Sequence, residues 1–308
     1  MTPSRRAAVS KASRSSRPLR LRKRATPKQP RKVRRRLAKR AVAKAKAPAK
    51  RVTKPKKAAK GAKPAKRPAA KPAPAAAAVA PVLPPPGKLR IAVFGAGGTL
   101  GSRIAAEAVA RGHLVTPVQR SPGFVKLGAH RVGMRRGDAF DSASVANVAQ
   151  GHDAVVSAVA PPADKPELLV RAARGLVAGC RAAGVPRLVV VNGAGSLLVP
   201  VDPRFGTDAK QLLDTPEFPR DWRPTAVAHR DALAYLKDAA GGLQWTAISP
   251  PALIQPGVRT GRYQLGTDRL LKGRDGQSRI SAEDYAVAVV DELEKGRFKG
   301  KRMTVAWP

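Results

Sequence analysis

The sequence predicts an α/β protein with one doubly wound parallel sheet, preceded by a long disordered basic tail. Strand-like and helix-like segments alternate through residues 88–308, as expected for a parallel sheet with crossover helices. A glycine-rich turn joins the first strand to the first helix. Residues 1–87 differ sharply, because they contain no acidic and no aromatic residue. We therefore assign residues 1–87 to a tail with its linker and residues 88–308 to a single domain.

The tail carries much of the chain's positive charge. It holds 29 of the 60 lysines and arginines and none of the 20 acidic residues, in a chain with a formal net charge of +40. Residues 54–74 form a loose Lys-Pro-Ala repeat, and residues 75–86 form an extended Pro/Ala linker. With few apolar side chains and strong self-repulsion, such a segment cannot build a core. We expect it to be disordered.

Residues 1–87 resemble the tails of linker histones and of bacterial histone-like proteins. A segment of this kind neutralises phosphates and releases counterions, so it predicts nucleic-acid contact that ignores sequence and weakens with salt. Without aromatic side chains it offers no surface on which single-stranded bases could stack. A solubilising extension, a misassigned start codon and an organelle import peptide are the alternatives.

Composition also bears on the compartment. The charged start is not followed by the apolar segment that a secretory signal would have. The sequence also lacks a run of 18 apolar residues, which a membrane-spanning helix would need. The single cysteine, Cys180, excludes an intramolecular disulfide and a cysteine-rich zinc site, and its helical context predicts a small core residue. We expect a cytoplasmic protein, with nucleoid association as the alternative that the tail allows.

The sequence predicts a βαβ unit in the first part of the domain. Strand 91–94 is followed by glycines at 95, 97, 98 and 101, by a helix over 99–110 with Gly112 beyond its end, and by strand 114–118. Glycines at such a turn let the backbone approach a pyrophosphate, toward which the helix directs its free N–H groups. The pattern predicts a dinucleotide site, against the alternative of a tight turn that binds nothing.

The end of the second strand indicates which dinucleotide. NAD-dependent proteins usually place an acidic residue there to hold the ribose 2′-hydroxyl. This chain has Gln119-Arg120-Ser121, without a nearby carboxylate. The guanidinium of Arg120 suits a 2′-phosphate, so NADP(H) is favoured over NAD(H). A solvated surface arginine is the alternative.

The later elements continue the alternation. We expect further strands at 131–135, 154–159, 188–191, 245–248 and 303–306, and further helices near 142–149, 166–183, 226–239 and 281–294. Asp141 and Ser281 are candidates for helix N-caps, with acids after Ser281 at the positive end of its helix.

Ligands of such sheets gather beyond the carboxyl ends of the strands, so we expect the loops there to contact the cofactor. Asp138 is suited to accept from an adenine amino group, and the small residues after the fourth strand let a ribose lie against the backbone. The predicted cofactor-binding residues are Gly95, Gly97, Gly98, Thr99, Leu100, Gly101, Arg120, Asp138, Ala139, Ser157, Val159, Asn192, Gly193, Ser249, Pro250 and Pro251.

These segments together resemble an atypical short-chain dehydrogenase/reductase. The similar branch includes flavin reductase, biliverdin reductase B and the nitrogen-metabolite-repressor group. The resemblance is carried by IAVFGAGGTLGSRI, the Arg120 corner, GDAFD, AVVSAVAPP, GVPRLVVVNGAGS, WTAISPP, TGRY and RISAEDYAVAV, which cover nearly all of residues 88–308. It implies a Rossmann-type NAD(P)-binding domain, with the prolines after Ser249 at the nicotinamide end.

One departure separates this chain from the standard members. They use a Tyr-x-x-x-Lys pair, whereas none of Tyr235, Tyr263 and Tyr285 has a lysine four residues later. In the flavin-reductase-like branch, hydride can pass directly to a bound flavin or quinone. His229, on the helix where the tyrosine pair would lie, is the candidate proton donor, with a packed or surface histidine as the alternative.

The other histidines and the loop around Trp222 are expected to have no role in catalysis or cofactor binding. His113, His130 and His152 lie at turns and are expected to be solvated, and the loop around 202–223, with Trp222, is expected to cover the substrate side. No set of residues predicts a metal site.

Three functions fit the sequence. The first is an NADPH-dependent reductase of a small aromatic or quinonoid acceptor, flavin included, with an accessory tail. The second is an NADP-sensing regulator without turnover, and the third is a nucleoid-associated protein that binds DNA through its tail. The acceptor and the oligomeric state are left open by the sequence.

Overall fold

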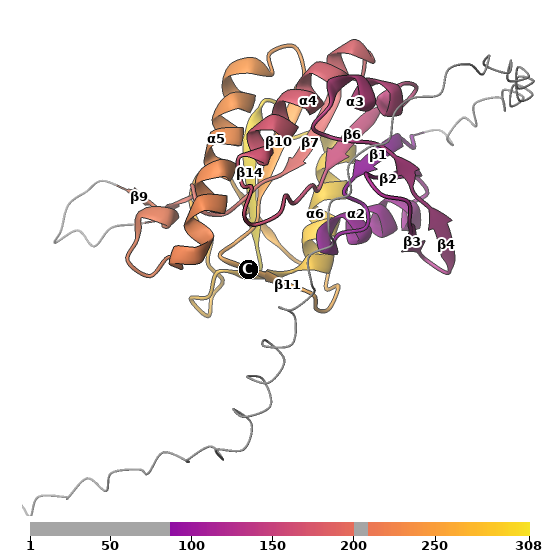
Figure 1. The fold of residues 1–308 in the computed structure, drawn as a ribbon. Coiled ribbons are helices and arrows are strands. Elements are labelled where there is room, and N and C mark those ends of the chain that lie inside the picture. The colour runs from indigo at the N-terminus through magenta and orange to yellow at the C-terminus, as the bar shows by residue number, and fades with distance from the viewer. Residues whose placement is uncertain (1–86, 200–208) are drawn as a thin grey trace, which may run out of the picture. The chain divides into compact units, whose positions relative to one another are not determined.

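The computed structural model describes residues 87–199 and 209–308 (Figure 1). The expected disordered tail therefore lies outside the described residues, apart from Gly87. Within the described residues, the strands are β1 Arg90–Phe94, β2 Leu114–Gln119, β3 Phe124–Leu127, β4 His130–Gly133, β5 Arg135–Arg136, β6 Ala154–Ser157, β7 Arg187–Val191, β8 Leu198–Val199, β9 Lys210–Gln211, β10 Gln244–Ser249, β11 Leu253–Gln255, β12 Gln264–Gly266, β13 Arg279–Ser281 and β14 Lys301–Ala306. The α-helices are α2 Thr99–Ala110, α3 Ser142–Ala149, α4 Leu168–Ala182, α5 Arg223–Ala239 and α6 Ala282–Lys295.

Eight strands form the main sheet, in the order β12-β14-β10-β7-β6-β1-β2-β5. All neighbours are parallel except β12, which runs antiparallel to β14. The chain order reverses between β1 and β6, where two crossover connections leave in opposite directions. Such a switch point creates a crevice at the carboxyl ends of the strands. The predicted doubly wound Rossmann-type sheet is confirmed.

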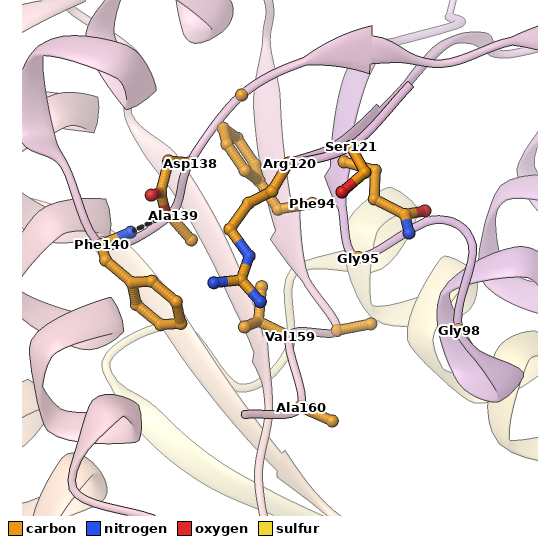
Figure 2. Close-up of a pocket in the computed structure, with 13 residues that line it drawn as sticks. Phe94, Gly95, Gly98, Arg120, Ser121, Asp138, Ala139, Phe140, Val159 and Ala160 are labelled. Atoms are coloured by element: carbon orange, nitrogen blue, oxygen red, sulfur yellow. Dashed lines mark hydrogen bonds between the residues drawn. The ribbon is translucent and has the colours of Figure 1, made fainter. Parts of the chain in front are cut away.

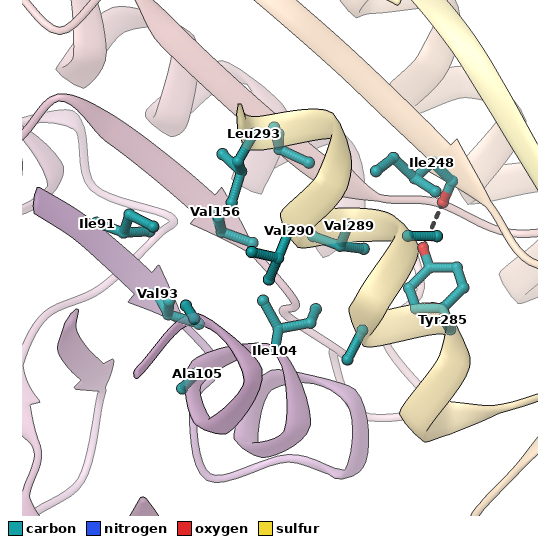
Figure 3. Packing of buried hydrophobic residues seen from close by; sticks show 14 of the residues in the cluster. Ile91, Val93, Ile104, Ala105, Val156, Ile248, Tyr285, Val289, Val290 and Leu293 are labelled. Carbon is teal, nitrogen blue, oxygen red and sulfur yellow. Dashed lines mark hydrogen bonds between the residues drawn. The ribbon is translucent and has the colours of Figure 1, made fainter. Parts of the chain in front are cut away.

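Helices cover both faces of this sheet. On one face α6 packs against α2, where Ile104, Val289, Val290 and Leu293 meet the strand residues Val93 and Val156 (Figure 3). On the other face α3, α4 and α5 lie in sequence and bury a second core around Phe94 and Leu188. Full burial of each such side chain stabilises the fold by roughly 1.5–3 kcal/mol. The two cores fix the strands whose ends form the crevice.

The residues that the sequence predicts at the ends of helices have these roles in the structure. Gly112 follows α2 with a φ of +84°, a left-handed conformation that favours glycine. The Asp141 carboxylate accepts from the Ala143 N–H at 3.0 Å, and the Ser281 hydroxyl accepts from the Asp284 N–H at 3.0 Å. These two N-caps fix where α3 and α6 begin.

The prediction for the third strand was wrong. Residues 131–135 do not form one strand, because β4 ends at Gly133 and belongs to an antiparallel hairpin with β3 that lies beside α2. The third position of the parallel sheet is taken by the two residues of β5, which pair with the end of β2. The short strands β8, β9, β11, β12 and β13 were not predicted either.

No helix in the ranges 87–199 and 209–308 combines the length and the apolarity needed to cross a membrane.

Candidate functional site

The glycine turn between β1 and α2 is a backbone cradle. Gly95 has a φ of +79°, and a Cβ on it would lie 2.5 Å from the Ala158 carbonyl oxygen. A Cβ on Gly101 would lie 2.1 Å from the Gly95 carbonyl oxygen, so the helix can pack on the turn only without a side chain there. No side chain caps the start of α2 at Gly98, and its first turn holds no acidic residue. Its N–H groups at Thr99 and Leu100 are therefore suited to bind an anion.

A pocket of about 220 Å³ opens beside this turn (Figure 2). It lies at the carboxyl ends of β1, β2, β5 and β6. Of the predicted cofactor contacts, Gly95, Gly98, Arg120, Asp138, Ala139 and Val159 line it. Ala158 and Ala160, two of the small residues expected to lie against a ribose, also line it. Sequence reasoning missed the other lining residues, which are Phe94, Gln119, Ser121, Gly137 and Phe140. Most of them adjoin a predicted residue, so reading whole strand ends would have found them.

Arg120 and Phe140 face each other in this pocket (Figure 2). The guanidinium carbon lies 5.2 Å from the centre of the ring, a cation–π contact. Arg120 takes part in no ion pair among the described residues. Its charge is therefore available to a ligand anion.

Asp138 is held in place by its own loop. Its carboxylate accepts from the Phe140 N–H at 2.9 Å, and its N–H donates to the Ser144 hydroxyl at 2.9 Å. One carboxylate oxygen is thus committed to the loop, while the residue still lines the pocket. This geometry suits a carboxylate that accepts from a base amino group.

A second polar group lies farther along the same edge of the sheet. Asn192, directly after β7, is 5% exposed, and its amide oxygen accepts from Nδ1 of His229 on α5 at 3.1 Å. Gly193 lies against the His229 ring, because a Cβ there would be 2.9 Å from ring carbons. Both polar residues line a cavity of about 20 Å³ that also touches Ser157 and Val159.

Burial lowers the pKa of His229 to about 4, so the ring is neutral near pH 7. His229 therefore carries no extra proton to donate at that pH. Its catalytic role, proposed from the sequence, stays a prediction.

Ser249 ends β10 on this same edge, Pro250 and Pro251 follow it, and all three are buried. Gly97 lies under the Gln119 side chain, whose amide oxygen would be 2.0 Å from a Cβ at residue 97. The predicted contacts thus fall into two groups, one around the glycine turn and one around Asn192. Val159 lines both cavities and joins them.

The expectation for two other histidines was wrong. His113 is 4% exposed, accepts at Nδ1 from the Leu89 N–H at 3.1 Å, and bonds through Nε2 to Glu294 at 3.0 Å. His152 is half-buried and bonds to the Thr116 hydroxyl at 2.8 Å. Burial lowers the pKa of His152. His130 is exposed, as expected.

The remaining candidates are accounted for structurally. Cys180 is buried in the core, and burial raises the pKa of its thiol to about 12, so it is no nucleophile. Trp222 is 68% exposed, while residues 202–208 of the loop expected to cover the substrate side lie outside the described residues. Within the described ranges, no three His, Cys, Asp or Glu side chains are grouped to hold a metal.

Comparison with known proteins agrees with this geometry. Residues 95–295 match the NAD(P)H-binding family. The chain belongs to this family. It is 39% identical over 220 residues to the uncharacterised protein YwnB of Bacillus subtilis, covering 70% of this chain and 98% of that protein.

Solved structures are similar to the domain in sequence and fold. A candidate exported protein from Burkholderia pseudomallei is 48% identical, with a TM-score of 0.61, over 71% of this chain and 100% of that one. A candidate NADH-flavin reductase from Streptococcus pneumoniae is 34% identical, with a TM-score of 0.62, over 71% and 100%. The expected resemblance to flavin-reductase-like members of the short-chain dehydrogenase/reductase group is confirmed.

Family membership makes a nicotinamide dinucleotide the implied cofactor, and the residues present fit one. The turn has an open backbone cradle where side chains at Gly95 or Gly101 would clash, and no side chain caps the helix that follows it. Arg120 has no acidic partner within the part of the chain that the structure describes. These features suit the pyrophosphate of a nicotinamide dinucleotide.

Proposed function

We propose that this protein is an NADPH-dependent reductase that passes hydride to a small aromatic or quinonoid acceptor, flavin included. The observation that carries the proposal is Arg120, which faces the nucleotide pocket where NAD-dependent proteins place a carboxylate. The description of the pneumococcal structure as a candidate NADH-flavin reductase supports the class of acceptor.

Different residues of the chain would bind different parts of the cofactor. The pyrophosphate would lie on the turn and helix start, at Gly95, Gly98, Thr99, Leu100 and Gly101. Arg120 would hold the 2′-phosphate, Asp138 and Ala139 the adenine side, and Ser157 and Val159 the riboses. Asn192, Gly193 and the Ser249–Pro251 loop would border the nicotinamide end, where small and rigid residues leave room for a ring.

When bound, the nicotinamide supplies a hydride, and the protein supplies positioning and a dry surface. Among the described residues, Tyr263 and Tyr285 are not set up as proton donors at this edge. The Tyr285 hydroxyl donates to the Ile248 carbonyl at 2.7 Å in the core, and the Tyr263 hydroxyl donates to Asp291 at 2.6 Å. Burial raises the pKa of both hydroxyls well above the usual value. A direct hydride acceptor that needs no positioned tyrosine is consistent with this arrangement.

The test is NADPH oxidation with a panel of flavins and quinones. Turnover supports a reductase. Binding of NADPH without turnover of any acceptor would instead support a regulatory protein that senses NADP without catalysis.

For residues 1–87 we propose contact with nucleic acid that is independent of sequence, on the strength of 29 basic and no acidic residues. Gel shifts of the full chain and of a chain lacking residues 1–87, across a salt series, test this. Binding that vanishes with the tail and weakens steeply with salt supports the proposal. A shift that persists without the tail would refute it.

A further inference from the structure

The antiparallel β3–β4 hairpin, which lies beside α2 in Figure 1, has one buried face and one exposed face. Val125 and Leu127 lie on the buried face, where they are 5% and 3% exposed and pack in the core that includes residues of α2. Because side chains alternate along a strand, Phe124 and Lys126 lie on the opposite face, and both are exposed. Arg131 pairs with Lys126 across the hairpin and is exposed on the same side. We call Phe124, Lys126 and Arg131 the hairpin face.

The charges on the hairpin face are not neutralised from nearby in the chain. Residues 108–137 contain six lysines and arginines and no Asp or Glu. The helix that the hairpin packs against, α2, holds one acid, Glu107, and this acid pairs with Arg111 and Arg259. Within the ranges 87–199 and 209–308, Lys126 and Arg131 form no ion pair. Like charges directly opposite each other destabilise a hairpin, so this pair gains stability when an anion binds beside it.

Phe124 distinguishes this face from an ordinary charged surface. The residue is 59% exposed, although large apolar side chains are usually buried. The guanidinium carbon of Arg131 lies 4.4 Å from the centre of its ring, so the cation and the ring are held together. Gly133 stands opposite Phe124 in the hairpin, and a Cβ there would meet nothing within 4 Å. The hairpin face therefore offers an open aromatic ring with two positive charges beside it.

A single strand of nucleic acid has both of the groups that this face can bind. Its phosphates carry the negative charge, and its unpaired bases have flat faces that stack on aromatic side chains. In a duplex these faces are stacked inside the helix and cannot reach an exposed ring. An acidic peptide would satisfy the two cations but would leave the ring unused. The combination of charge and aromatic ring thus favours an unpaired strand.

We propose that the hairpin face binds single-stranded nucleic acid, with one base stacked on Phe124 and neighbouring phosphates on Lys126 and Arg131. The inference rests, for its affinity, on the nucleic-acid contact proposed for residues 1–87, which supply charge but no aromatic side chain. One base and two phosphates are too few contacts to hold a strand during electrophoresis, so a chain lacking residues 1–87 should still give no gel shift. In the full chain, the covalent link to the tail raises the local concentration of strand at the hairpin.

The stacking contact is tested by fluorescence anisotropy of the full chain with an oligothymidylate and with a duplex of equal length. Phe124→Ala should weaken binding of the single strand about 5- to 150-fold, the usual effect of losing one stacked base, and leave the duplex unchanged. Phe124→Trp should keep the affinity for the single strand. Trp222→Ala, which removes another aromatic side chain that is 68% exposed, is the matched control and should bind as wild type does. Equal losses on both nucleic acids in Phe124→Ala, or no loss on either, would overturn the proposal.

The phosphate contacts are tested by the salt dependence of the same binding. Each phosphate contact on a single strand contributes about 0.7 to the slope of log K against log salt, so Lys126→Ala with Arg131→Ala should lower the slope by about 1.4. Arg220→Ala with Lys237→Ala removes two exposed cations outside the hairpin and should leave the slope unchanged. Equal slopes in the two double variants would contradict the proposal. Polyglutamate should bind wild type and Phe124→Ala alike, and polyglutamate binding that depends on Phe124 would assign the face to an acidic protein instead.

Photocrosslinking separates this inference from the proposal for the tail. The full chain is irradiated with an oligothymidylate in which one thymine is replaced by 5-iodouracil, and the adducts are located by mass spectrometry. We expect an adduct on Phe124 and none on Trp222. Adducts that are absent, confined to residues 1–87 or equally abundant on Trp222 would refute the hairpin contact, whatever the tail does. An adduct on Phe124, together with an affinity that is unchanged when residues 1–87 are removed, would instead refute the proposal for the tail and retain this one.

Discussion

The guanidinium carbon of Arg120 lies 5.2 Å from the centre of the Phe140 ring, across the mouth of the nucleotide pocket. The two residues come from different strand ends, β2 and the loop before α3, so the fold brings them together. The ring holds the cation in place without neutralising it. This contact explains how an arginine can be oriented for a ligand phosphate without a carboxylate partner.

Arg120→Ala should weaken NADPH binding selectively. A charge-assisted hydrogen bond contributes about 1.5–3 kcal/mol, so we expect a roughly 10- to 100-fold loss for NADPH. NADH lacks the 2′-phosphate and should lose less than about threefold on the same reasoning. Titration calorimetry with both nucleotides measures this. Arg136→Ala, at an exposed arginine of β5, should leave both affinities unchanged. An equal loss for both nucleotides in Arg120→Ala would defeat the assignment.

Gly101→Ala should damage both the fold and the site. Alanine favours helix over glycine by about 1 kcal/mol, but overpacking costs about 1–3 kcal/mol and the clash here is with backbone. The new Cβ would lie 2.1 Å from the Gly95 oxygen and push α2 off the turn. We expect a lower Tm and weaker binding of NADPH and NADH alike. Gly133→Ala, where nothing lies within 4 Å, is the control. An unchanged Gly101→Ala protein would argue against the cradle.

The buried Glu292 should be essential for stability. It accepts from Arg187 at 2.8 Å, from the Thr246 hydroxyl at 3.1 Å and from the Phe298 N–H at 3.0 Å. Glu292→Ala leaves the Arg187 charge buried alone, which should cost about 3–5 kcal/mol of unfolding free energy. Asp231 forms an exposed ion pair with Arg230, so Asp231→Ala should lower the free energy of unfolding by less than about 0.5 kcal/mol. Chemical denaturation compares the two. Similar small losses in both would contradict the prediction.

The protein should become less stable in acid because the Asp291 carboxylate becomes protonated. Burial raises its pKa, but hydrogen bonds from Lys295, Tyr263 and Arg111 outweigh burial and lower it from 3.8 to about 2. Because the folded pKa is depressed, the stabilisation is complete above pH 3.8 and is lost as the pH falls toward 2.

Thermal unfolding from pH 2 to 7 follows this loss. Asp291→Asn should lower the Tm at pH 7 and make the decline below pH 4 shallower. Asp238→Asn, at an exposed position, should reproduce the wild-type curve. An Asp291→Asn curve parallel to wild type would assign the acid sensitivity elsewhere.

The sequence predicted the first βαβ unit closely because its signals are local. An apolar run, spaced glycines and a C-cap glycine all fall within residues 91–118 and agree with one another. The hairpin β3–β4 escaped, although Phe124 to Leu127 alternates between exposed and buried side chains and Gly128 has a φ of +60°. That alternation could have revealed it. The three-residue strands β11 and β13 carry no such pattern, since each is defined by its partner.

Local sequence patterns could not predict the environment of a residue whose contacts lie far away in the chain. His113 looked like a turn residue, but its partner Glu294 lies 181 residues away on α6. The contact of His229 with Asn192 likewise joins α5 to the end of β7. The sequence placed both near the cofactor edge from the order of the elements. It could not show that burial keeps the histidine neutral.

The measurement that tests the account most directly is a calorimetric titration of the full chain with NADPH and with NADH, paired with thermal unfolding in their presence. We predict that both bind, that NADPH binds more tightly, and that NADPH raises the Tm more than NADH does. No heat and no thermal protection from either nucleotide would contradict the dinucleotide site on which the assignments depend.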